Sequence, residues 1–311
     1  MFPISKEQIE KLDASDLDSL FSLDSNGFFL APEESLQEYK KRILLTAEKI
    51  AHIDKELREN GEYALFDEMH FRSEDCIPSE IMSEAAEITR RLYGFAVDWA
   101  PGFFLSQGVG FLWGGCAISL PEERIMLFLL RNSFAKKKRW FIYRRDELLS
   151  HELCHIARMP LCDRTFEEHF AYQTSNSRFR RYIGNCFRSK WDSIFFLAPV
   201  MILLAVQIAI LLLELPVPIW PFWILAGAYP AYLIARNHMT RIQYFRARKV
   251  LLEFGAAHPD FVLFRCSKEE IVEISRIRDN NKAKEWLKNK AASELRWRII
   301  MRYFADGSSG E

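Results

Sequence analysis

Two long apolar segments separated by a short turn constrain the fold of this chain more than any other feature. The first covers residues 195–213, which contain one strongly polar residue, and the second covers residues 216–235, which contain no charged residue. Each segment is long enough to cross the hydrocarbon core of a bilayer as a helix. Three prolines within residues 216–221 predict a tight turn. We therefore expect a two-helix transmembrane hairpin over residues 195–235.

Basic residues on both sides of this hairpin predict its orientation. The two residues between the apolar segments, Glu214 and Leu215, carry no positive charge, whereas both flanks are basic. Because an excess of Lys and Arg marks the cytoplasmic side, we expect an integral membrane protein with both termini in the cytoplasm. The flanking basic residues are Arg178, Arg180, Arg181, Arg188 and Lys190 before the hairpin, and Arg236, Arg241, Arg246, Arg248 and Lys249 after it.

The charge balance indicates which partners to expect. Lys and Arg number 42, Asp and Glu also number 42, and the formal net charge is zero. A neutral chain has no general field that attracts nucleic acid, so no nucleic-acid partner is expected. The clustered basic residues beside the hairpin would instead meet anionic lipid headgroups. The lipid bilayer is therefore the first expected partner.

Residues 151–155 read His151-Glu152-Leu153-Cys154-His155 and form an H-E-x-x-H motif. On a helix the two histidines lie one turn apart on the same face, where both can bind one Zn²⁺ ion. Glu152 lies beside them, where its carboxylate can accept a proton from a metal-activated water. The motif therefore predicts a zinc site with Glu152 as the catalytic base.

A catalytic zinc site needs a third protein ligand, and the next acidic cluster supplies candidates. Glu167, Glu168 and His169 open a second helical run that follows the motif. Glu168 is the preferred ligand because Glu168 with Ala171, three residues later, resembles the E-x-x-A pattern of the gluzincins, in which the small residue lets the second helix approach the first. Glu167 and His169 remain alternatives. Another interpretation is that these three residues form a solvated first helical turn.

With these residues the chain resembles the zincin metallopeptidases, and specifically the gluzincins, in which a glutamate on a second helix completes the site. The resemblance rests on His151, Glu152, His155 and Glu168 and covers roughly residues 100–185. It implies a protein or peptide substrate and a strand beside the motif helix that binds the substrate backbone. The chain departs from thermolysin-like members at Tyr172, where they have an aspartate, so no partner for a zinc-binding histidine is assigned. Tyr172 and His169 are the nearest candidates for stabilising the transition state or supporting the ligands.

The remaining sequence predicts an α+β protein: a mainly helical zincin-like catalytic domain with a small antiparallel sheet, plus the transmembrane hairpin. Helices are expected over residues 6–20, 32–60, 78–93, 239–255 and 281–304, with a further helix after a capping box at Ser267. Strands are expected within residues 102–143 and at 261–264. The expected regions are an N-terminal helical region (1–94), a catalytic core (95–190), the hairpin (195–235), a cytoplasmic helical region (236–305) and a disordered tail (306–311).

These features predict a membrane-anchored zinc-dependent endopeptidase that hydrolyses peptide bonds on the cytoplasmic side. Two alternatives belong to other classes. One is a non-catalytic membrane-bound metal-sensing or regulatory protein that keeps a zincin fold, and the other is a structural membrane protein with an accidental motif. An intact Glu152 argues against the first alternative, because a site without turnover has no need of a base.

Overall fold

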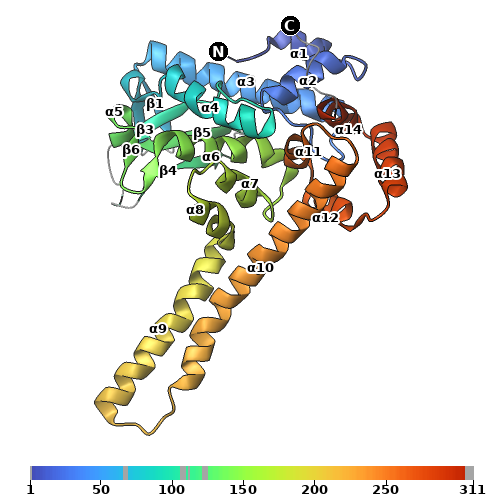
Figure 1. The fold of residues 1–311 in the computed structure, drawn as a ribbon. Coiled ribbons are helices and arrows are strands. Elements are labelled where there is room, and N and C mark those ends of the chain that lie inside the picture. The colour runs from blue at the N-terminus through green and yellow to red at the C-terminus, as the bar shows by residue number, and fades with distance from the viewer. Residues whose placement is uncertain (1, 66–68, 106–109, 111–112, 121–124, 305–311) are drawn as a thin grey trace.

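The computed structural model describes residues 2–65, 69–105, 110, 113–120 and 125–304. Most of these residues are helical, and they form a body of helices and small sheets from which two long helices project (Figure 1). The expected mainly helical architecture with small sheets is therefore present. The expected tail at 306–311 lies outside the described residues. The helices that precede the projecting pair are α1 (Lys6–Lys11), α2 (Leu17–Ser25), α3 (Leu36–Glu59), α4 (Ser79–Tyr93), α5 (Ser133–Lys136), α6 (Arg145–Arg158), α7 (Glu167–Gln173) and α8 (Arg178–Ile183).

Local signals explain where the two long N-terminal helices begin and end. Ser35 and Glu38 form the capping box that starts α3. Gly94 ends α4 in the left-handed conformation, with φ of 68°. A Cβ atom on Gly94 would also lie 2.5 Å from the ring of Phe261, so both backbone and packing require glycine there. Between these helices lies an antiparallel pair that the sequence pattern did not predict, β1 (Glu62–Leu65) and β2 (Met69–Arg72).

A three-stranded sheet packs against the helix that carries the motif. It contains β3 (Gly102–Leu105), β4 (Gly115–Leu120) and β5 (Ile125–Arg131) in the order β3-β5-β4. β4 pairs antiparallel with β5, but β3 pairs parallel with it, so the expected antiparallel sheet is in fact mixed. β4 forms an edge of the sheet and packs against α6. The last expected strand is a minimal hairpin of β6 (Arg139–Trp140) and β7 (Tyr143–Arg144).

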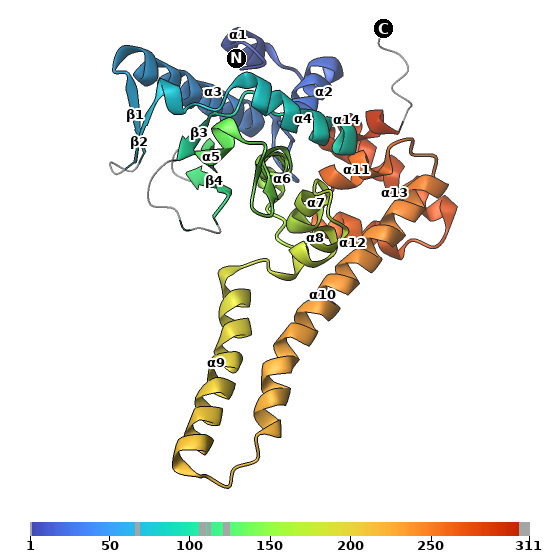
Figure 2. The same ribbon diagram turned by 60° about the vertical axis from the view of Figure 1, so that its left-hand side comes forward.

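The two projecting helices, α9 (Lys190–Leu213) and α10 (Trp220–Glu253), run antiparallel beside each other (Figures 1 and 2). Within the described part of the chain, α9 alone is long and apolar enough to cross a membrane by length and composition. The expectation of two such helices is therefore corrected. Most of the second apolar segment lies in α10, where its Trp, Tyr, Pro and Gly residues lower the mean hydropathy. The same helix α10 also includes most of the separate helix expected at 239–255.

A polar network joins the two helices where they leave the body. Arg236 of α10 makes two hydrogen bonds to the carboxylate of Asp192, at 2.9 and 3.1 Å. Arg188 donates to the hydroxyl of Thr240 at 2.8 Å, and Asn185 donates to Asn237 at 3.2 Å. Arg188 and Arg236, two of the basic residues that we expected to meet lipid headgroups, thus make hydrogen bonds within the protein.

The C-terminal helices are α11 (Pro259–Arg265), α12 (Lys268–Arg276), α13 (Asn280–Ser293) and α14 (Leu295–Ile300). The expected strand at 261–264 is wrong, because Pro259 favours the first turn of a helix. The long helix expected over 281–304 breaks at Glu294, which has an extended backbone. The capping box at Ser267 is confirmed.

A buried arginine joins the two ends of the chain. Arg265 makes a 2.5 Å ion pair with Asp24 and donates to the carbonyl of Tyr93 at 2.7 Å. The N- and C-terminal helices therefore share one hydrophobic core with the helix that carries the motif.

Candidate active site and metal centre

The motif lies on α6. The face of this helix opposite the two histidines packs into the core and so holds the helix in place. Leu149, Leu153 and Ile156 on that face are buried, as their helical spacing predicts. α6 packs against α4, against β4 and against α7. His151 and His155 lie on the remaining face and keep side-chain exposures of 15% and 16%. They are sheltered but accessible.

α7 places the acidic cluster opposite the histidines. Phe166 and Phe170 are fully buried and anchor this short helix in the core. Ala171 is also fully buried, and its backbone carbonyl interacts with His151. The small side chain expected at this position thus lies where α6 and α7 meet, and Glu168 lies one turn earlier on α7.

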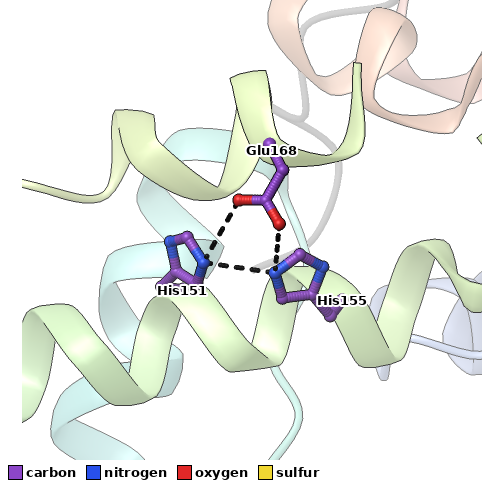
Figure 3. A group of neighbouring side chains, drawn as sticks. All are labelled: His151, His155 and Glu168. Atoms are coloured by element: carbon purple, nitrogen blue, oxygen red, sulfur yellow. Dashed lines mark hydrogen bonds and ion pairs between the residues drawn. The ribbon is translucent and has the colours of Figure 1, made fainter. Parts of the chain in front are cut away.

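The side chains of His151, His155 and Glu168 converge on one point (Figure 3). The Nε2 atoms of the two histidines are 3.2 Å apart. The Glu168 carboxylate oxygens lie 3.6 Å from Nε2 of His151 and 3.7 Å from Nε2 of His155. The structure therefore brings together the three residues that the sequence predicts as ligands.

The spacing of these atoms fits a divalent ion. Zinc ligands at about 2.0–2.2 Å in a tetrahedral arrangement are separated from one another by roughly 3.3–3.5 Å. Here the two histidine nitrogens are 3.2 Å apart, and each lies 3.6 or 3.7 Å from a different oxygen of the Glu168 carboxylate. Two imidazole nitrogens and one carboxylate oxygen are also the ligand types that catalytic zinc sites use. These residues could hold zinc with only small side-chain movements.

The pKa values of the two histidines are shifted in opposite directions. Burial and the charge of His155 hold the pKa of His151 well below its usual value. Burial also lowers the pKa of His155, but the hydrogen bond with Glu167 and the charge of Glu168 outweigh it and raise this pKa to about 9. His155 is therefore the protonated member and donates to His151. A bound metal ion would take the place of that proton.

Glu167 lies on the outer side of His155, away from the cluster. Its Oε1 atom is 2.9 Å from Nδ1 of His155. A carboxylate in this position fixes the orientation of the ring and makes its other nitrogen a stronger ligand. The sequence left Glu167 as an alternative ligand, and the structure places it as the histidine partner that the sequence did not assign.

Glu152 lies beside the converging atoms and is largely buried. Its Oε2 atom accepts a hydrogen bond from the backbone N–H of Ala117 on β4, at 3.0 Å. Burial raises the pKa of Glu152, whereas the charge of His155 and the Ala117 hydrogen bond lower it, and burial prevails. A carboxylate that is held by one oxygen and is more basic than usual is suited to accept a proton.

Tyr172 packs edge-on against His151, with ring centroids 4.6 Å apart. Burial and the charge of Glu168 raise the pKa of Tyr172 to about 12, so its hydroxyl group keeps its proton and can donate a hydrogen bond. A Cβ atom on Gly184 would lie 2.1 Å from the Tyr172 ring. The ring can occupy this position only because residue 184 has no side chain.

His169, the other candidate for this role, lies elsewhere. It is fully buried and packs in a tilted arrangement against Tyr244 of α10, with ring centroids 4.6 Å apart. Burial, followed by the charge of Arg241, lowers its pKa to about 3, so the ring is neutral. The structure does not bring His169 to the converging ligands.

Two clefts meet at the cluster and share His151, Glu152, Tyr172 and Phe187. The first, called the apolar cleft, has a volume of about 490 Å³ and is also lined by Trp113, Ile142, Leu148, Phe179 and Ile183. The second, called the charged cleft, has a volume of about 500 Å³ and is also lined by Arg164, Arg188, Glu167 and Glu168. An extended chain can therefore pass across the site and leave side chains on both sides of it.

No known protein family, curated protein or solved structure matches this chain. What the site can do therefore follows from its own residues. Structural zinc sites are closed by four protein ligands, whereas catalytic sites leave one position open. Among the described residues three candidate ligands converge here, and the space beside them is open to two clefts. This arrangement suits hydrolysis better than structural support.

Proposed function

We propose that this protein is a membrane-anchored, zinc-dependent endopeptidase with a zincin-like catalytic core. The observation that carries the proposal is the convergence of His151, His155 and Glu168 where two clefts meet, with the carboxylate of Glu152 beside them. Zinc bound there would polarise the scissile carbonyl group and lower the pKa of a water molecule.

The protein side chains then carry the proton transfers. Glu152 accepts the proton of the attacking water and returns it to the amine that leaves. The hydroxyl group of Tyr172 donates a hydrogen bond to the carbonyl oxygen as negative charge develops there. Glu167 keeps His155 in the orientation that ligand binding needs.

The edge strand β4 is proposed to bind the substrate backbone. The N–H of Ala117 points toward the site, since it donates to Glu152 rather than to β5. An extended substrate added beside β4 would form backbone hydrogen bonds and cross both clefts. The scissile bond would then lie above Glu152.

We further propose that α9 crosses the bilayer and that the first half of α10 returns beside it. In α9 only Asp192 and Leu203 are buried by the protein, so its apolar surface needs another cover. Trp220 and Trp223 of α10 are 64% and 58% exposed near the hairpin tip, where the aromatic belt of a bilayer would place them. The body and both termini would then be cytoplasmic.

Cysteine labelling in intact cells tests this topology. A membrane-impermeant thiol reagent is expected to label Glu214→Cys and not Arg181→Cys or Arg241→Cys, because Lys and Arg are absent from the turn and abundant in the flanks. The exposed Cys162 is replaced by Ser in all three variants, and labelling after permeabilisation is the control. Labelling of Arg241→Cys in intact cells would mean that α10 does not return and would refute the paired arrangement.

Turnover in detergent tests the peptidase function. The purified full-length protein is expected to cleave an unstructured test protein, to stop when a chelator removes the metal, and to recover when Zn²⁺ is added back. Peptide fragments are measured by mass spectrometry, and His155→Ala purified in parallel controls for contaminating peptidases. Equal cleavage by both proteins, or full activity in chelator, would reject the proposal.

A further inference from the structure

We propose that the substrate is a membrane-proximal segment of an integral membrane protein, and that Phe179 and Phe187 seat its apolar side chain in the apolar cleft. This inference rests on the peptidase function proposed above. It adds a substrate class and two residues that select it.

The wall of the cleft continues directly into the candidate membrane helix. Phe187 lines both clefts, and its ring packs against Phe196 of α9, with centroids 5.6 Å apart. α9 begins at Lys190, three residues after Phe187. Trp191 at this start is 56% exposed, as expected for a side chain at a bilayer interface. The active site is therefore close to the level at which the chain enters the bilayer.

Exposed apolar side chains line the apolar cleft, beside the ion pair of Glu147 with Arg180. Phe179 is 69% exposed, Ile142 is 49% exposed and Phe187 is 40% exposed, and all three line the cleft. Exposed apolar groups that converge on a cleft mark a surface that an apolar ligand covers. α8 and β4, which form walls of the cleft, lie on the side of the body from which α9 leaves (Figure 2).

These observations favour one occupant over a soluble peptide. An extended chain advances about 3.3 Å per residue. A segment that leaves the bilayer beside α9 would therefore reach the cleft within a few residues, while its apolar character is still high. A peptide from solution gains nothing from a cleft that opens beside the membrane.

Three reporters in lipid vesicles test the proposal. Each carries the same unstructured segment in which Phe, Leu and Ala alternate with Ser and Gly. In the near reporter this segment directly follows a transmembrane helix. In the far reporter a long Gly-Ser linker separates the two, and the soluble reporter has no helix. The full-length protein, reconstituted with each reporter, is expected to cleave the near reporter at least about tenfold faster than the other two.

The far reporter controls for confinement to the same membrane, and variants test the two aromatic residues. Phe179→Ser and Phe187→Ser should each slow cleavage of the near reporter by about tenfold, since one apolar contact in a pocket contributes this much discrimination. Phe179→Leu and Phe187→Leu should restore most of it, and Leu252→Ser, at an exposed apolar residue on the far part of α10, should have no effect. Zinc content shows that each variant keeps its site.

Three outcomes would overturn the inference. Equal cleavage of near and far reporters would show that proximity to the bilayer is not selected. Slowing of the near reporter by the Ser variants without a similar slowing of the soluble reporter, which carries the same segment, would show that the two aromatics only hold the body on the membrane. Cleavage of no reporter by wild type, with zinc bound, would reject the peptidase function and this inference with it.

Discussion

Replacing Glu152 by glutamine is expected to lower peptide-bond cleavage by roughly 10²–10⁴-fold while zinc content and fold stay unchanged. The amide has nearly the same shape, and its oxygen can still accept the hydrogen bond from the N–H of Ala117. It cannot accept the proton of the attacking water. Glu152 lies outside the three converging residues, so the metal should remain.

The measurement compares kcat for an unstructured test protein, zinc per chain and thermal stability in detergent. Glu87→Gln is the matched control, because Glu87 is an exposed glutamate on α4 that pairs only with Arg90 among the described residues. Equal cleavage by wild type and Glu152→Gln, both with zinc, would show that Glu152 is not the base, whereas no cleavage by either while both held zinc would reject the peptidase function. The non-catalytic regulatory alternative would then be preferred.

Purified protein is expected to carry about one zinc per chain, and Ala at His151, His155 or Glu168 should remove it. Each of these side chains supplies one of the three converging atoms, and two ligands hold zinc far less tightly than three. Elemental analysis of protein purified in detergent gives the stoichiometry.

Glu167→Ala tests whether the two adjacent glutamates have different roles. Glu167 contacts His155 through the outer ring nitrogen, so its loss should weaken zinc binding by about 10–100-fold without changing the stoichiometry at saturating zinc. A competition titration against a zinc chelator measures this. Full zinc in Glu168→Ala together with its loss in Glu167→Ala would reverse the two assignments.

The sequence predicted those parts of the structure that depend on neighbouring residues. The capping box at Ser267 marks the start of a helix because its signal acts within one turn. The spacing of His151 and His155 predicts their common face for the same reason. Glu168 was expected opposite them because Glu168 and Ala171 resemble the E-x-x-A pattern of the gluzincins.

Other features depend on contacts that a single stretch of sequence does not contain. The parallel pairing of β3 with β5 joins strands across the intervening β4. The apolar residues 261–264 fit a strand as well as a buried helix, and Pro259 before them decides for the helix. Glu167 and Glu168 are adjacent and chemically identical, so only the position of α7 against α6 distinguishes the histidine partner from the converging residue.

Helix α10 connects the proposed bilayer region mechanically to the body of the protein. Residues 231–253 contain neither proline nor glycine, so about 35 Å of unbroken helix connects the proposed bilayer region with the core of the body. Tyr244 of this helix packs against His169 of α7, the helix that also carries Glu168. Bilayer thickness changes the tilt of membrane helices. A change in the tilt of α9 and α10 would therefore shift α7 and with it the position of Glu168 relative to the two histidines.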